Sequence, residues 1–199
     1  MTAAALLLSG GMDSVALAYW LRPAHAITVD YGQMAARGEL EAASSVCRSL
    51  NIPHHVVRVD CRALGSGDMA GTAAHGAAPA SDWWPYRNQL LITLTAMRAI
   101  TLNVDTLMIG TVRGDAGHLD GTPGFVERLD ALMRYQEGGL RVTAPAIAMS
   151  TAELIRTADV PLSLLAWAHS CHVSDIACGT CRGCNKHREV TGELDLDPY

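Results

Sequence analysis

Short apolar runs of strand length alternate with longer segments of helical pattern along the first half of this chain. Four runs have the length and the apolar character of buried strands: 3–8, 26–30, 54–60 and 106–110. Apolar residues recur at helical spacing over 39–50 and over 88–102. Strands that alternate with helices predict an α/β fold with a parallel, doubly wound sheet.

The same pattern indicates where a ligand would bind. In doubly wound sheets, ligands lie beyond the carboxyl ends of the strands. The segments 9–14, 30–33 and 110–120 each follow a predicted strand, so we expect all three to share one pocket. Residues 62–81 are rich in Gly, Ala and Ser without a sustained period, which predicts a long loop.

A glycine turn with polar flanks follows the first predicted strand, where residues 9–14 read Ser-Gly-Gly-Met-Asp-Ser. A strand, a glycine turn and a helix start expose backbone N–H groups at the positive end of a helix, where a phosphate binds. Ser9 and Ser14 add hydroxyl donors, and Asp13 either holds a divalent metal such as Mg²⁺ or caps the helix. This pattern predicts an ATP site. The alternative is a plain strand-to-helix turn capped by Asp13 or Ser14.

Two other phosphate-binding motifs are excluded by the sequence. A Walker-type loop needs a lysine before its Ser or Thr, and the only lysine in the chain is Lys186. The Gly-x-Gly-x-x-Gly pattern of dinucleotide-binding folds is absent as well.

Composition narrows the class of protein. The 199 residues suffice for one sizeable core, with 49% hydrophobic and 18% charged residues. We expect no membrane partner, because no apolar run approaches the roughly 18 residues of a span, and no signal peptide, because the start lacks a basic region. A net charge of −5 gives no basic field for nucleic acid. A cytoplasmic protein with small-molecule partners is therefore predicted.

Four cysteines with spacers of six, two and two residues lie near the end of the chain: Cys171, Cys178, Cys181 and Cys184. A Cys-x-x-Cys turn presents both sulfurs to the same point, so four thiolates at this spacing can surround one tetrahedral ion. A four-thiolate zinc site has no open position, and we therefore expect a structural Zn²⁺. An iron–sulfur cluster and a redox pair of cysteines are the alternatives.

These motifs together resemble a known family. The loop at 9–14 is similar to the Ser-Gly-Gly-x-Asp-Ser loop of the PP-loop ATP pyrophosphatases, and with the four cysteines it resembles the 7-cyano-7-deazaguanine synthase family of the queuosine pathway. Asp-Tyr-Gly-Gln at 30–33 matches the same family, and Trp-Pro-Tyr-Arg-Asn at 84–88 resembles its Val-Pro-Gly-Arg-Asn. Gly-Thr-Val at 110–112, followed by two acids, resembles its Thr-Gly-Val loop.

The resemblance implies a fold and an activity. It implies a PP-loop domain of the adenine nucleotide alpha hydrolase type over 1–165 and a small zinc-binding region over 166–199. The implied enzyme is a carbon–nitrogen ligase that adenylates 7-carboxy-7-deazaguanine and converts it with ammonium, through the amide, into the nitrile. AMP and pyrophosphate are the products, and a homodimer is expected.

The resemblance also implies roles for individual residues. The nucleotide-binding residues would be Leu8, Ser9, Gly10, Gly11, Met12, Asp13, Ser14, Asp30, Tyr31, Gly32, Gln33 and Gly110. Asp13, Ser14 and Arg87 are the expected catalytic residues. Arg87 would hold the substrate carboxylate or the charge on the α-phosphate, unless it is a structural arginine paired with an acid. Asp115 and Asp120 would accept the N–H edge of the guanine-like ring, or else cap turns.

Three segments depart from the family pattern. Met-Ala-Ala at 34–36 replaces a basic pair, and Gly-Thr-Pro-Gly-Phe at 121–125 replaces Cys-Arg-x-Glu-Phe. The first cysteine spacer has six residues against the usual eight. Because polar groups in the pocket set substrate choice, two alternatives remain. One is a divergent enzyme that joins the same or a related carboxylate to another amine, such as one on a protein. The other is a nucleotide-binding module without chemistry.

Overall fold

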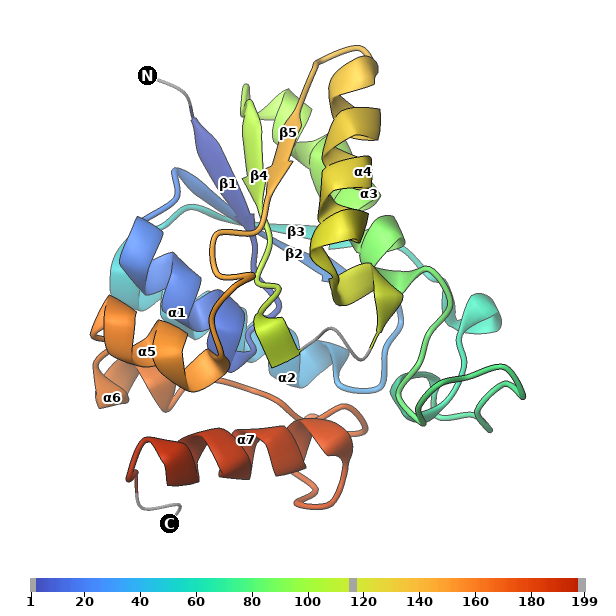
Figure 1. Cartoon of the computed structure of the whole chain (residues 1–199), viewed down its shortest axis with the longest axis vertical. Helices are drawn as coiled ribbons and strands as arrows, with labels where there is room; N and C mark the ends of the chain where they lie inside the picture. The colour runs from blue at the N-terminus through green and yellow to red at the C-terminus, as the bar shows by residue number, and fades with distance from the viewer. Residues whose placement is uncertain (1–2, 115–117, 197–199) are drawn as a thin grey trace.

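The computed structural model describes residues 3–114 and 118–196 and contains a parallel sheet between two helical layers (Figure 1). Within the described residues, five strands pair in the order β3-β2-β1-β4-β5, and every pairing is parallel. The strands are β1 (Ala4–Leu7), β2 (His25–Asp30), β3 (His54–Arg58), β4 (Thr106–Met108) and β5 (Arg141–Thr143). The predicted doubly wound α/β fold is therefore confirmed.

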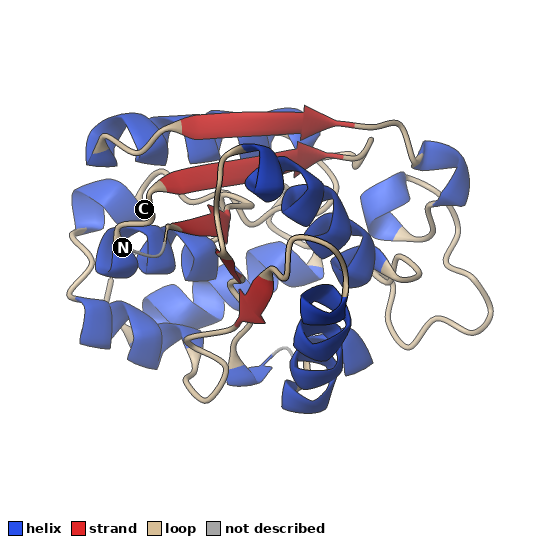
Figure 2. Cartoon of the chain, turned by 90° about the horizontal axis from the view of Figure 1, so that it is seen from above, coloured by secondary structure: helices blue, strands red, loops and turns tan. Residues whose placement is uncertain are grey.

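Helices cover both faces of this sheet (Figure 2). One face packs against α1 (Met12–Leu21), α2 (Ala36–Leu50), α5 (Thr151–Ala158) and α6 (Leu162–Leu165). The other face packs against α3 (Arg87–Thr101) and α4 (Pro123–Tyr135). Leu6 and Leu8 point into the first core, while Ala5 and Ile27 point into the second. This alternation follows from the two-residue period of a strand that is buried on both faces.

Strand order places a ligand crevice at the centre of the sheet. The chain runs outward from β1 through β2 to β3, and then returns to the other side of β1 to form β4 and β5. Connections therefore leave β1 and β4 in opposite directions, and such a switch point opens a crevice beyond the carboxyl ends of these two strands. The 9–14 loop follows β1, and Gly110 follows β4 at this crevice.

The C-terminal segment folds back over the start of the chain. The backbone N–H of His169 donates to the carbonyl of Gly10 at 2.9 Å. The last helix, α7 (Arg182–Glu193), packs against α5 and contributes Val190 to the core around α1. In Figure 1, α7 runs across the bottom of the view, below α5. Within the described residues, no helix combines the length and the apolar character needed to span a bilayer.

The predicted elements agree with the structure except at their ends. Helix α2 begins three residues before the predicted 39, and the predicted loop 62–81 contains two short 3₁₀ turns, Arg62–Leu64 and Asp68–Ala70. Another such turn spans Leu119–Gly121. The sequence pattern did not predict α4, β5, α5, α6 or α7.

Candidate active site and metal centre

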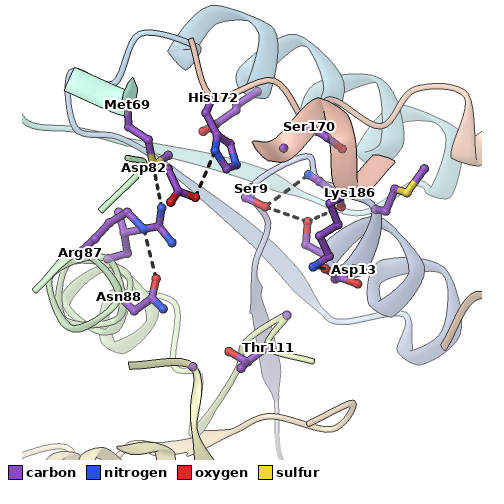
Figure 3. Close-up of a pocket in the computed structure, with 18 of the residues that line it drawn as sticks. Ser9, Asp13, Met69, Asp82, Arg87, Asn88, Thr111, Ser170, His172 and Lys186 are labelled. Carbon is purple, nitrogen blue, oxygen red and sulfur yellow. Dashed lines mark hydrogen bonds and ion pairs between the residues drawn. The ribbon is translucent and has the colours of Figure 1, made fainter. Parts of the chain in front are cut away.

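A cavity of about 350 Å³ opens at the switch point of the sheet. Its walls come from the 9–14 loop, the start of α3, the segment after β4, and the C-terminal segment with α7. Figure 3 shows Ser9 and Asp13 on one side of this cavity, and Arg87 and Asn88 across from them. Segments far apart in the sequence therefore converge on one space.

The 9–14 loop is held in shape by its own serines. Ser14 Oγ donates to the carbonyl of Gly11 at 3.0 Å, and Ser9 Oγ lies 3.2 Å from Ser14 Oγ. Gly11 is the N-cap of α1 and has no side-chain cap, so Asp13 and Ser14 lie inside the first turn. The alternative in which Asp13 or Ser14 caps the helix is therefore wrong. Met12, Asp13 and Ser14, the first residues of α1, line the cavity, and the first N–H groups of a helix have no partner within the helix, which makes such a start suitable for an anion.

Two glycines allow the loop to lie close to its neighbours. Gly10 has φ +86°, and a Cβ there would stand 2.8 Å from the carbonyl oxygen of Glu39. A Cβ on Gly110 would stand 3.3 Å from the backbone of Ser14. The glycines thus pack the loop tightly between α2 and the end of β4, which leaves the cavity side open.

Asp13 is paired with a cation from the far end of the chain. Its Oδ2 accepts a hydrogen bond from Lys186 Nζ at 3.1 Å, and both side chains line the cavity. Lys186 stands in the second turn of α7. The chain's only lysine, absent from the loop in sequence, therefore lies beside that loop in space (Figure 3).

Arg87 begins α3 and lines the cavity opposite the 9–14 loop. It donates to Met69 Sδ and to Asn88 Oδ1. Among the described residues, no carboxylate lies within ion-pair distance of Arg87. This does not support the alternative that Arg87 is a structural arginine paired with an acid. Asp120 also lines the cavity, and its Oδ2 accepts the backbone N–H of Asn88 at 3.3 Å. Asp115 lies outside the described residues.

The four cysteine sulfurs form a compact cluster beside the cavity. All four Sγ atoms lie within 4.8 Å of one another, and two pairs, Cys178–Cys184 and Cys171–Cys181, are 3.9 Å apart. Zn–S bonds of about 2.3 Å in a tetrahedron place the sulfurs about 3.8 Å apart. A disulfide would need about 2.05 Å, and each cysteine in the described residues is free. The donor set therefore fits a single tetrahedral ion.

Backbone N–H groups also point at these sulfurs. The N–H groups of Thr180 and Cys181 lie 3.5 and 3.4 Å from Cys178 Sγ, and they lower the pKa of that thiol to about 6. Burial raises the pKa of Cys184 to about 12. A thiolate must be formed for metal binding, and N–H donors of this kind stabilise it. A cubane iron–sulfur cluster binds each thiolate to a separate iron and needs wider spacing than these sulfurs show.

Comparison with known proteins identifies the family. A family model described as "Queuosine biosynthesis protein QueC" matches residues 3–193. The chain belongs to the QueC family.

Relatives with assigned names align with nearly the whole chain. The 7-cyano-7-deazaguanine synthase of Thiobacillus denitrificans is 33% identical, covering 94% of this chain and 92% of its own. That of Desulforudis audaxviator is 31% identical, covering 91% and 92%. Among solved structures, the U34-tRNA thiolase NcsA from Methanococcus maripaludis, determined with its 4Fe–4S cluster, matches with a TM-score of 0.55 at 19% identity. The match covers 98% of this chain and 64% of the thiolase. At this identity the likeness shows the fold alone.

The Asp-Tyr-Gly-Gln segment of this QueC protein does not lie wholly in the cavity. Tyr31 lines it, whereas Asp30, Gly32 and Gln33 do not, and neither do Leu8 and Gly10. Gln33 is buried and accepts the backbone N–H of Tyr31 at 2.9 Å. It also donates to Glu39 Oε2 at 2.7 Å. The glutamine thus positions Glu39, a carboxylate that the sequence pattern did not indicate as part of the site.

Glu39 lines the cavity from the first turn of α2. Burial raises its pKa to about 7, while the hydrogen bond from Gln33 and the charge of Arg87 act in the opposite direction. Glu39 follows the Asp-Tyr-Gly-Gln segment by six residues. Its position at the start of a helix next to that motif could have identified it as a candidate site residue.

A second carboxylate, Asp82, joins three parts of the cavity wall. It is 8% exposed, and its Oδ1 accepts a hydrogen bond from Arg182 Nη1 at 2.7 Å. His118 Nε2 lies 3.7 Å from the same oxygen, and His172 Nδ1 lies 3.4 Å from Oδ2 (Figure 3). Burial lowers the pKa of His172, and the charge of Asp82 opposes that effect. Asp82 therefore ties the end of the 62–81 loop to the cysteine region, a contact that no local pattern indicates.

Proposed function

We propose that this QueC protein is an ATP-dependent carbon–nitrogen ligase that converts 7-carboxy-7-deazaguanine and ammonium into 7-cyano-7-deazaguanine. The relatives named 7-cyano-7-deazaguanine synthase over nearly the full chain support this reaction. The structural observation that carries it is the shared cavity of the 9–14 loop, Asp13 and Arg87 at the switch point. Family membership does not favour either alternative raised by the altered 121–125 segment.

The chemistry requires two activations of one carbon. A carboxylate resists attack because its leaving group would be oxide, so its oxygen first attacks the α-phosphorus of ATP and pyrophosphate leaves. Ammonia then displaces AMP and gives the amide, with loss of a proton. A second ATP activates the amide oxygen, and departure of AMP with the remaining N–H protons gives the nitrile. A single ATP site can serve both halves, because both steps need the same positioning and charge stabilisation around phosphorus.

Residues on different sides of the cavity would have different roles in this reaction. The N–H groups at the start of α1, with Ser9 and Ser14, would hold the pyrophosphate portion of ATP. Arg87, across the cavity, would hold the substrate carboxylate and the charge on the α-phosphate. Asp120 would accept the N–H edge of the deazapurine, and we propose the same role for Asp115. Tyr31 and Gly110 would line the nucleotide.

Two metal ions belong to the proposal. Asp13 presents a carboxylate to the cavity and would hold Mg²⁺ together with phosphate oxygens. Bound there, Mg²⁺ would neutralise phosphate charge. The four cysteines would hold a structural Zn²⁺, as their spacing fits one tetrahedral ion. We extend the proposal to a cytoplasmic homodimer with an ATP-binding domain at 1–165 and a zinc-binding region at 166–199.

Pyrophosphate release from Mg-ATP tests the proposal through Asp13. We expect release by the unaltered protein only when 7-carboxy-7-deazaguanine is added. Asp13→Ala should lower that rate by at least about 100-fold, because it removes the metal-binding carboxylate. The thermal unfolding midpoint separates this loss from unfolding, and Asp68→Ala, at a carboxylate outside the cavity lining, serves as control. Full activity in Asp13→Ala would exclude the metal-binding role.

A further inference from the structure

Lys186 occupies a position that the proposed reaction leaves without a role. Its Nζ lies 3.1 Å from Asp13 Oδ2, and its side chain keeps 41% of its surface exposed toward the cavity that it lines. Asp13, by contrast, is 16% exposed. The ammonium group is therefore next to the 9–14 loop on a side chain that is more exposed than the carboxylate it contacts.

The charge distribution around that loop explains what an ammonium could do there. ATP brings several negative charges to a loop whose own donors are neutral N–H and hydroxyl groups. Arg87 supplies a cation from the opposite wall, where the proposed function places the reacting carboxylate. When the bond between the α-phosphorus and the bridging oxygen breaks, its electron pair leaves with pyrophosphate. A cation on the pyrophosphate side stabilises that developing charge.

We propose that Lys186 is a phosphate-binding catalytic residue that contacts the pyrophosphate portion of ATP and stabilises it as it leaves. This inference rests on the use of ATP in the proposed function. Asp13 Oδ2 accepts a hydrogen bond from this ammonium group in the structure, and Lys186 turns from Asp13 to the phosphates when nucleotide binds. A lysine suits this exchange because it is a point charge on a flexible stem.

The cysteine cluster sets the position of this lysine. Cys181 is the N-cap of α7, its sulfur accepts the N–H of Cys184 at 3.4 Å, and Lys186 follows two residues later. Gly183 packs so tightly that a Cβ there would collide with the carbonyl of Ser170. The start of α7 is therefore fixed against the 169–172 segment, which directs Lys186 at Asp13.

Because Lys186 is the only lysine of the chain, its amine can be followed selectively in the unaltered protein. The protein is treated briefly with an acetyl N-hydroxysuccinimide ester, with free lysine added as a reference, and acetylation is measured by peptide mass spectrometry. We expect Mg-ATP and Mg-pyrophosphate each to slow acetylation of Lys186 at least tenfold, and AMP to have a much smaller effect. Equal rates with and without pyrophosphate, or equal protection by AMP and ATP, would overturn the proposal.

Substitutions provide a second test with a matched control. Lys186→Met should lower substrate-dependent pyrophosphate release about 100-fold, the usual effect of losing one preorganised charge-stabilising donor. It should leave AMP affinity and metal content unchanged, and Lys186→Arg should restore part of the rate. Arg188→Met removes an exposed cation from the same helix and should behave as the unaltered protein. Unchanged pyrophosphate release in Lys186→Met would overturn the proposal. If that variant does not fold, the acetylation result decides.

The outcomes also separate this inference from the proposed function. If Mg-ATP protects Lys186 but the protein forms no nitrile, the proposed function is overturned and the proposed phosphate-binding role of Lys186 is retained. Nitrile formation together with an unprotected Lys186 would overturn the role and keep the function.

Discussion

At the residue scale, the neighbours of a side chain determine its chemistry as much as its type does. Glu39 lies against the buried amide of Gln33 and faces a cavity, and burial raises its pKa to about 7. The Asp-Tyr-Gly-Gln motif led us to expect Gln33 at the nucleotide. The structure instead places it beneath Glu39, because its side chain bonds to the backbone of β2 and its end. A motif predicts that residues act together, but not which of them faces the ligand.

The raised pKa of Glu39 makes stability depend on pH in a defined direction. The folded protein holds this proton up to about pH 7, whereas the unfolded chain releases it near the ordinary value of 4.5. The resulting contribution to the free energy of unfolding is fully present below pH 4.5 and is lost as the pH rises through 7. Glu39→Gln cannot ionise and should therefore gain stability relative to the unaltered protein between pH 5 and 8, by up to about 3 kcal/mol.

Urea unfolding of the ligand-free protein at several pH values measures this difference. Glu41→Gln is the control, since Glu41 lies on the same helix in an exposed ion pair with Arg37 and should leave the pH profile unchanged. Parallel profiles for Glu39→Gln and the unaltered protein would show that Glu39 keeps an ordinary pKa.

At the element scale, the predicted segments are those whose sequences carry a strong period. Helices α2 and α3 each have 15 residues with an apolar face, and the strands around β1 are short apolar runs. Strand β5 has only three residues and α6 only four, too few to show a period. Two later helices begin with sequence signals that are typical of helix N-termini. Ser150 and Glu153 form a capping box at α5, and Pro123 follows the N-cap Thr122 of α4.

The cysteine cluster gives the element-scale prediction. Cys178→Ser should lower the bound metal below one ion per chain and reduce the thermal unfolding midpoint, because metal binding is coupled to folding of the segment before α7. Cys61→Ser makes the same change at a buried cysteine outside the cluster and should keep full metal content. Metal analysis of the purified variants, with chelator-treated protein alongside, measures the effect. A protein that is metal-free and equally stable would contradict the structural role.

At the scale of the whole molecule, the site exists only because the two ends of the chain meet. Gly10 bonds to His169, Asp13 pairs with Lys186, and Asp82 binds Arg182 across 100 residues of sequence. The sequence predicted which sheet edge would carry the site, because alternating strands and helices form a parallel sheet whose carboxyl ends lie at one edge. It did not predict Lys186 or Asp82 there, because these contacts arise from the packing of α7 and have no local signal. The resulting cavity brings the 9–14 loop, the start of α3 and α7 together.

Formation of the nitrile tests the central claim most directly. The protein is incubated with Mg-ATP, 7-carboxy-7-deazaguanine and ¹⁵N-labelled ammonium, and the products are analysed by mass spectrometry. We predict ¹⁵N-labelled 7-cyano-7-deazaguanine with two AMP formed per nitrile. Formation of AMP without any nitrile, or no AMP at all in the presence of both substrates, would contradict the proposed function.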